Sequence, residues 1–284
     1  MSFLPSSPLI TETRVFVSPE RLGNPVRIVM AASAAAVNAA VPGARHQWPF
    51  ALCLAWLRDD AGRHRIAVTC EQAGQPIQIC GHGLLAVAQL AFGISQRPLE
   101  LVSGTYCFQV LPPDPGGSTV WLQTERPAWQ SVADSGEAAW FSPQPEHVAV
   151  ITSGPEDGYR LIVLPPGVPL DSIRVDLTAI ARYDRRALLL TQRATGAEQL
   201  RCDYRLRYFA PQYGNPEDAA TGSAHWLAAA WWSEQLHRAE LRSEQCPPTG
   251  DGWQPGPRPG GVIHTRTSDR CVALSGELSP FCRL

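Results

Sequence analysis

The chain has 284 residues, of which 44% are hydrophobic and 18% charged, and its formal net charge is −2. These values are typical of a globular protein with a sizeable core, long enough for two domains of roughly 140 residues each. The small net charge argues against nucleic acid or an anionic membrane as a partner, and the absence of lysine excludes Schiff-base chemistry and a phosphate-binding Walker lysine.

The N-terminal segment has neither the basic nor the apolar region of a signal peptide, and no apolar run reaches the roughly 18 residues of a membrane span. We therefore expect a cytoplasmic protein. Eight cysteines show no Cys-x-x-Cys spacing and no metal-ligand spacing with histidine, so we expect no metal site. We interpret them as reduced thiols, most of them core residues.

Short apolar or alternating runs dominate the first half of the chain and predict β-hairpins. In chain order these candidate strands are 15–17, 26–30, 65–69, 77–80, 99–102, 106–111 and 120–123. In the segment LELVSGTYCFQVL, Gly104 and Thr105 form the predicted turn of one hairpin.

The second half repeats this pattern, with candidate strands at 148–151, 161–164, 187–191, 205–209, 262–265 and 272–274. Residues 171–183 predict a short helix. The tract 246–261, rich in proline and glycine, predicts a surface loop rather than a disordered tail, because a strand pattern follows it directly.

Two segments, 83–92 and 223–236, differ from this β-rich background because they are rich in alanine and leucine and apolar almost all round, which predicts buried helices. Each follows a turn of small residues, and the two turns lie half a chain length apart. We therefore predict an α+β fold of two similar lobes, each a β-barrel or curled sheet wrapped round a central helix. The lobes are residues 1–127 with helix 83–93 and residues 128–284 with helix 222–236, and the last strand can return to the N-terminal lobe.

The two turns could hold an anion. The first backbone N–H groups of a helix have no internal partner and carry partial positive charge, and glycine lets a ligand approach them closely. Two such helix N-termini that point into one cleft between the lobes would suit a carboxylate. The simpler interpretation is that both turns only start core helices, and the local sequence leaves both interpretations open.

Side chains around the turns add candidates for chemistry: Cys80, His82, Glu217, Asp218, Thr221 and Ser223. A helix N-terminus favours the thiolate form of a nearby cysteine, and a histidine near a carboxylate makes an acid/base pair. Each also has a structural interpretation, with Cys80 as a buried thiol, His82 as a helix cap and Asp218 as an anchor of its turn.

Together, CGHGLLA (80–86) and PEDAATGSA (216–224) resemble the two glycine-turn motifs of the PhzF-like isomerases, the phenazine-biosynthesis relatives of diaminopimelate epimerase. GNPVRIVM, RYFAPQYG, GPRPGGVIHTR and VALSGELSPF are similar to further family segments, in the same order along nearly the whole chain. The Glu-Asp-x-x-Thr-Gly-Ser string is specific, whereas Gly-Asn-Pro alone is a weak signal.

The resemblance implies two barrel-like lobes with the active site between them, and proton transfer at carbon without a cofactor. It also implies a small carboxylate-bearing substrate and a homodimer. His82 and Asp218 match the family's histidine and aspartate. The expected substrate contacts are Asn24, Gly81, Gly83, Thr221, Gly222 and Ser223. Cys80 matches the first of two paired cysteine bases of the epimerase branch, but Thr221 stands at the second, so two-cysteine racemisation is not expected.

One departure concerns the family's catalytic glutamate, which usually lies in a Ser-Glu-Thr/Ser-x-Phe stretch. Here the region reads VPGARHQWPFALCLAW, and its best match puts Gln47 at the glutamate position. Glutamine cannot take up a proton at neutral pH, whereas the adjacent His46 could titrate. We therefore assign proton transfer to Asp218 and His82, with Cys80 and His46 as further candidates. Gln47 stays among the expected catalytic residues as a group that can donate and accept hydrogen bonds.

The sequence supports two hypotheses of different class. The first is an isomerase-like enzyme of specialised metabolism, which performs isomerisation, elimination or cyclisation. The second is a non-catalytic small-molecule-binding protein or pseudoenzyme that lost the family glutamate. A tryptophan-rich interaction module has less support, because Trp226, Trp231 and Trp232 fall on a predicted central helix, where core packing is expected.

Overall fold

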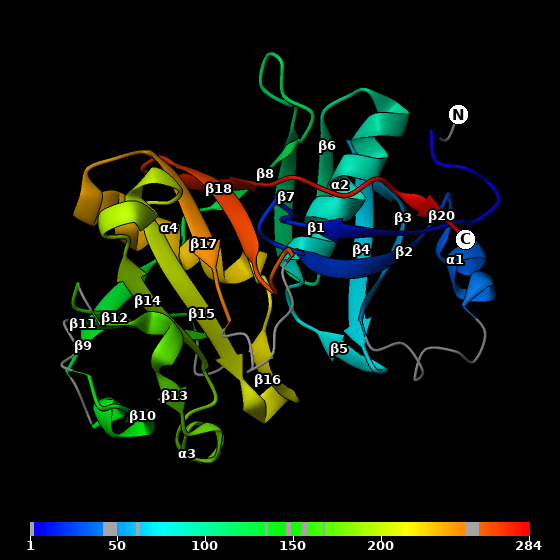
Figure 1. Cartoon of the computed structure of the whole chain (residues 1–284). Coiled ribbons are helices and arrows are strands. Elements are labelled where there is room, and N and C mark those ends of the chain that lie inside the picture. The colour runs from blue at the N-terminus through cyan, green and yellow to red at the C-terminus, as the bar shows by residue number, and fades with distance from the viewer. Residues whose placement is uncertain are drawn as a thin grey trace. The chain divides into compact units, whose positions relative to one another are not determined.

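The structure, a computed structural model, describes residues 3–41, 50–60, 63–133, 136–145, 149–154, 158–166, 168–247 and 256–284. The chain divides into two compact units, each treated by itself below (Figure 1). Unit 1 comprises Met1–Val17, Gly23–Thr124 and Ala273–Leu284, and unit 2 comprises Ser18–Leu22 and Glu125–Val272. The sequence had placed the division between residues 127 and 128, with only the last strand free to return.

A mixed sheet forms the body of unit 1. Its strands are β1 (Leu9–Val15), β2 (Asn24–Ala31), β3 (Ala51–Asp60), β4 (Arg63–Gln72), β5 (Gln75–Ile77), β6 (Leu99–Ser103), β7 (Tyr106–Leu111), β8 (Trp121–Glu125) and β20 (Cys282–Arg283). Neighbouring strands pair antiparallel except β2 with β3 and β4 with β6, which are parallel. The β6–β7 hairpin turns at Gly104, as predicted, and the positive φ of 58° there suits glycine.

Helix α2 (Gly81–Ser95) is the central helix of unit 1 and packs against β1, β2, β3 and β6 (Figure 1). All its residues from Gly81 to Ala88 are buried, because strands surround it on several sides. This burial accounts for its almost uniformly apolar sequence. The short helix α1 (Ala34–Ala40) starts at the cap Ser33 and packs on β2 and β3.

Unit 2 repeats this plan round helix α4 (Gly222–Leu236), which packs against β12, β17 and β18. The strands are β9 (Trp129–Val132), β11 (Ala149–Ser153), β12 (Tyr159–Leu164), β14 (Ala187–Arg193), β15 (Tyr204–Ala210), β16 (Asn215–Asp218), β17 (Glu240–Gln245) and β18 (Gly261–Thr267). Strand β19 (Cys271–Ser275) runs across the division between the units. The predicted α+β class, with a mostly antiparallel sheet round one helix in each unit, is confirmed.

Tryptophans of α4 lie in the core of unit 2, as expected for packing residues. The rings of Trp231 and Trp232 meet edge to face with centroids 4.6 Å apart, and Trp232 stacks on Tyr204 at 5.7 Å. The Trp232 indole N–H donates a hydrogen bond to the Thr191 hydroxyl at 3.0 Å. Among the described residues, none of the helices has the length and apolar character needed to traverse a bilayer.

The prediction of one helix over 171–183 is confirmed for residues 177–183 and wrong for the residues before them. Three elements occupy the region: a 3₁₀ turn (Leu170–Ser172), strand β13 (Arg174–Val175) and helix α3 (Leu177–Tyr183). Strand β13 pairs with β10 (Phe141–Ser142), and this pairing holds the backbone extended just before α3. The helix starts only at the cap Asp176, whose carboxylate accepts a hydrogen bond from the Ala179 N–H at 2.9 Å.

Some observed strands are displaced from their predicted positions, and others were not predicted. The candidate 15–17 is the end of β1, because Phe16 has a φ of 68° and ends the strand. Strand β3 was not predicted, because it lies buried on both sides and so lacks an alternating pattern. Strand β17 was not predicted either, since its sequence ELRSEQ is polar, yet its last three residues are buried. Residues 248–255 of the predicted surface loop lie outside the described part of the chain.

Candidate functional site

The turn before α4 holds the carboxylate of Asp218 in place. Asp218 ends β16 and is half-buried. The Thr221 hydroxyl donates a hydrogen bond to Asp218 Oδ2, and the Ala219 N–H donates one to Oδ1 at 3.0 Å. Thr221 is the N-cap residue of α4, so the carboxylate lies at the positive end of the helix. The turn thus presents a carboxylate whose orientation is set by donors on both of its oxygens.

Gln245, at the end of β17, fixes this turn from the side. Its side-chain N–H donates to the Asp218 carbonyl at 2.8 Å and to the Thr221 hydroxyl at 3.2 Å, and its Oε1 accepts from the Thr221 N–H at 2.7 Å. Gln245 is fully buried. The sequence analysis missed this residue, because only the parallel pairing of β17 with β15, which sets Gln245 opposite Leu206, brings it to the turn.

Glu217, the other acid of the motif, has a structural partner. The Arg207 guanidinium donates to both of its carboxylate oxygens, at 2.7 and 2.9 Å, in a bidentate pair. Arg207 also donates to the carbonyls of Leu170 and Ile173, at 3.1 and 2.6 Å. The bidentate ion pair with Arg207 thus gives Glu217 a structural role in the packing of this region.

His225 is the fourth residue of α4 and is fully buried. Its Nδ1 is 3.0 Å from the Tyr204 hydroxyl and 2.9 Å from the Ser243 hydroxyl. Burial disfavours the imidazolium form and lowers the pKa of His225 to about 3, although a hydrogen bond with Gln245 acts in the opposite direction. His225 is therefore neutral near pH 7 and serves as a core hydrogen-bonding group rather than as an acid.

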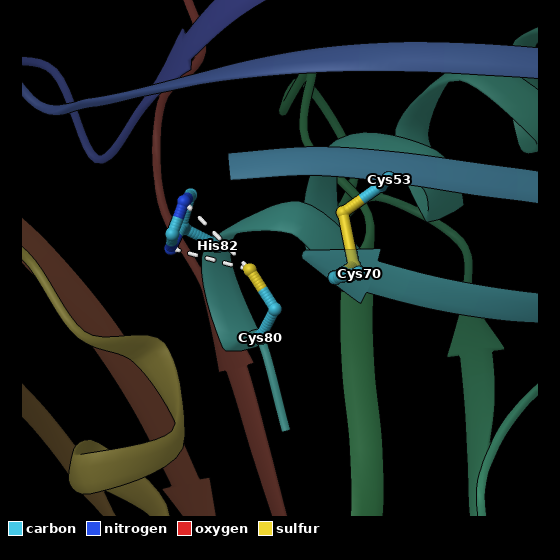
Figure 2. The surroundings of a disulfide bond; sticks show 4 residues. All are labelled: Cys53, Cys70, Cys80 and His82. Carbon is cyan, nitrogen blue, oxygen red and sulfur yellow. Dashed lines mark hydrogen bonds between the residues drawn. A yellow bond between two sulfur atoms is a disulfide. The ribbon is translucent and has the colours of Figure 1, made fainter. Parts of the chain in front are cut away.

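In unit 1, Cys80 and His82 lie together at the start of α2. The helix begins at Gly81, so Cys80 is its N-cap residue and the interpretation of His82 as a cap is wrong. The Cys80 sulfur lies 3.7 Å from Nδ1 and 3.8 Å from Nε2 of the His82 ring (Figure 2). Both residues are buried. The thiol and the imidazole are thus in direct contact at the start of α2.

The interpretation of the cysteines as reduced thiols is wrong for two of them. Cys53 in β3 and Cys70 in β4 are directly opposed across the antiparallel pair and form a disulfide, with their Cα atoms 4.2 Å apart. Their sulfurs and the Cys80 sulfur all lie within 4.8 Å of one another. Because a metal binds thiolates and not disulfide sulfurs, the cluster in this form does not supply a metal-ligand set. Burial raises the pKa of the Cys202 and Cys246 thiols to about 12, which fits core residues.

Gly83 packs directly beneath this sulfur cluster. A Cβ atom at Gly83 would lie 2.3 Å from the Cys53 sulfur, 2.9 Å from the Cys80 sulfur and 3.3 Å from the Cys70 sulfur. Glycine at this position thus has a packing reason, because any side chain would collide with the sulfur atoms. A contact of Gly83 with substrate stays a prediction.

Replacing Gly83 by alanine is expected to lower the free energy of unfolding by about 1–3 kcal/mol, because the new methyl group overpacks the sulfur cluster. The matched control is Gly93→Ala in the same helix, where a Cβ would meet nothing within 4 Å. There alanine should stabilise by up to about 1 kcal/mol through its higher helix propensity. Urea unfolding of both variants measures the effects, and equal shifts in the two would contradict the packing argument.

The remaining predicted site residues are placed as follows. Asn24 is the first residue of β2, is buried and lies opposite Val15. Gly222 is the first residue of α4, and the adjacent Ser223 is buried. His46 and Gln47 lie outside the described residues. The structure therefore brings Cys80 together with His82 in unit 1, and Asp218 together with Thr221 in unit 2.

Comparisons with known proteins agree with the motifs. The family model described as "Phenazine biosynthesis-like protein" (PhzC-PhzF) matches residues 62–251 of this chain. A protein from Pseudomonas aeruginosa named "uncharacterized isomerase" is 29% identical over 177 residues, which are 61% of this chain and 63% of that relative. An alignment with a mammalian relative spans only 40% of that protein. The chain thus matches less than two thirds of the length of either relative.

Solved structures share the fold at low sequence identity. A phenazine biosynthesis protein of the PhzF family from Enterococcus faecalis superposes with a TM-score of 0.70 at 17% identity, covering 97% of this chain and 99% of that one. A hydroxyproline epimerase from Agrobacterium vitis, solved with bound trans-4-hydroxy-L-proline, gives a TM-score of 0.53 at 8% identity and covers 100% of this chain and 92% of its own. These two matches speak for the fold alone. Since the family model covers most of the sequence, the chain belongs to the phenazine biosynthesis-like (PhzC-PhzF) family.

Proposed function

We propose that this protein catalyses proton transfer at carbon, without a cofactor, on a small carboxylate-bearing metabolite. The reaction would be an isomerisation or a related elimination or cyclisation. The observation that carries the proposal is the half-buried carboxylate of Asp218, oriented by Thr221 and Ala219 at the N-terminus of α4. A carboxylate in such a setting can accept a proton from an acidic C–H group.

The other site residues take supporting roles in this proposal. His82, in contact with the Cys80 thiol, would return a proton to the substrate. The first N–H groups of α2 and α4, at Gly81 and Gly222, would bind carboxylate oxygens, because they lack partners within their helices. Hydrogen-bond donors fixed in advance stabilise charge that develops during the reaction without the cost of reorganisation.

Support for an isomerase class comes from the name of the Pseudomonas aeruginosa relative and from the fold shared with an epimerase. We also propose that the protein acts in specialised metabolism, forms a homodimer and is located in the cytoplasm. In this reading Gln47 does not act as a base, since an amide takes up no proton near neutral pH.

Deuterium incorporation tests the proposal. The purified protein is incubated in D₂O with a panel of small carboxylates that carry an acidic C–H group, beginning with proline and the trans-4-hydroxy-L-proline bound by the epimerase neighbour. Proton NMR and mass spectrometry follow the labile carbon, with heat-denatured protein as the blank. Enzyme-dependent incorporation at one carbon of one panel member is the expected result.

Two results would contradict the proposal. Turnover of a panel member without incorporation of solvent deuterium would exclude proton exchange at carbon. Tight binding of a carboxylate, seen by calorimetry, without turnover or incorporation would assign the protein to the non-catalytic binding class instead.

A further inference from the structure

Three sulfur atoms and one imidazole ring gather beside the first turn of α2. The disulfide joins Cys53 to Cys70, and the Cys80 sulfur, which is not disulfide-bonded, lies within 4.8 Å of both sulfurs. On its other side, the Cys80 sulfur is 3.7 Å from His82 Nδ1. Figure 2 shows the Cys80 sulfur between the imidazole and the disulfide. A base, a thiol and a disulfide in this order are the components of thiol–disulfide exchange.

We infer that Cys53, Cys70 and Cys80 form one exchange cluster, in which the Cys80 thiol can replace either partner of the disulfide. The Cys80 sulfur gives its proton to His82 and forms a bond with its electron pair to the Cys70 sulfur. The Cys53–Cys70 bond breaks, its electron pair passes to the Cys53 sulfur, and that sulfur takes up a proton. One S–S bond forms and one breaks, so the step needs no oxidant or reductant. Attack on the Cys53 sulfur instead forms a Cys53–Cys80 disulfide and releases the Cys70 thiol.

The packing brings the three sulfurs together at Gly83. A Cβ there would fall within 3.3 Å of all three, so they converge on a residue of this turn that has no side chain. Cys53 and Cys70 lie on paired strands and cannot move far apart, whereas Cys80 lies just outside α2, at the N-cap position. We therefore expect Cys80 to supply the motion that the exchange requires.

Burial keeps the exchange within the molecule. The exposed fractions of Cys53, Cys70 and Cys80 are 0%, 5% and 3%. Since exchange requires access to the sulfur, external thiols are poor competitors for this disulfide. The exchanged form ties the Cys80 sulfur into the cluster and takes the thiol from His82. Only this consequence for activity rests on the proposed function, because the exchange itself follows from the positions of the sulfurs.

Disulfide mapping tests the cluster without any substrate. The purified protein is held at pH 8 without reductant, quenched with acid, unfolded and alkylated with N-ethylmaleimide. Proteolysis without reduction and tandem mass spectrometry then identify linked peptides. Peptides that link Cys80 to Cys53 or to Cys70 are expected beside the Cys53–Cys70 pair. In Cys53→Ser, treated with the small thiol oxidant diamide, the Cys70–Cys80 link should become the main product.

Matched variants control the experiment. Cys80→Ser should retain the Cys53–Cys70 link and lose every other, whereas Cys202→Ser, at a buried free thiol elsewhere, should leave the pattern unchanged. The inference is overturned if wild-type Cys80 is always alkylated and Cys53→Ser keeps two alkylated thiols after diamide. Because no activity is measured, a failure of the exchange and a failure of the proposed isomerase function are separate results.

Discussion

Asp218→Asn is expected to slow deuterium incorporation by about 10²–10⁴-fold, the usual contribution of a positioned general acid or base. Asparagine keeps the shape of the side chain, and its oxygen can still accept one hydrogen bond from the turn. It cannot take a proton from carbon. One of the two donors, the Thr221 hydroxyl or the Ala219 N–H, would then face an amide NH₂ group, so stability is measured in parallel by urea unfolding.

Glu217→Gln is the matched control for this prediction. The neighbouring acid is held by Arg207, and glutamine can still accept a hydrogen bond from that guanidinium. We expect Glu217→Gln to keep most of the activity. If Glu217→Gln abolished incorporation and Asp218→Asn retained it, the roles of the two acids would be reversed.

Arg160→Met is expected to lower the free energy of unfolding by about 3–5 kcal/mol, the usual cost of leaving a buried charge without its partner. Arg160 donates hydrogen bonds to the carboxylate of Glu137 and, at 2.6 Å, to that of Asp184. The Glu137 side chain is 0% exposed, so water cannot replace the lost guanidinium. The loss of Arg160 costs less at Asp184, since the Arg186 guanidinium lies 3.6 Å from the Asp184 carboxylate. Urea unfolding with a shared m-value measures the loss.

Two further variants test the cause. Glu137→Gln in the Arg160→Met background should recover much of the stability, because it removes the stranded charge. Arg266→Met breaks the pair with Glu240 on the surface, where both side chains are exposed, and should change stability by less than about 1 kcal/mol. A large loss in Arg266→Met, or no recovery in the double variant, would contradict the argument from burial.

Local sequence was sufficient where one short segment carries the whole signal. The two central helices are apolar all round, and the structure starts them at Gly81 and Gly222, within two residues of the prediction. The β6–β7 hairpin follows from a glycine turn between two β-forming runs. Local sequence failed at β3 and β17, because burial on both sides removes alternation and because buried polar residues look exposed in a sequence.

The site shows the same limit. Motifs identified Asp218, Thr221, Cys80 and His82, since each lies within four residues of a glycine in a turn that is visible in the sequence. Gln245, which fixes the Asp218 turn, carries no local signal, because it contacts that turn across strands distant in sequence. The partner of Glu217 was equally hidden, since Arg207 becomes its partner only when β15 and β16 pair.

By itself the sequence determined the α+β class, the two central helices, the family and the residues of both glycine turns. Periodicity, turn chemistry and motif spacing are properties of neighbouring residues, so they can be recognised without knowledge of the fold. Only the tertiary structure decided that Cys53 and Cys70 are bonded, that Cys80 lies within reach of both, and that Gly83 makes room for all three sulfurs. Those contacts depend on the register of β3 against β4 and on where α2 packs, which no local pattern encodes.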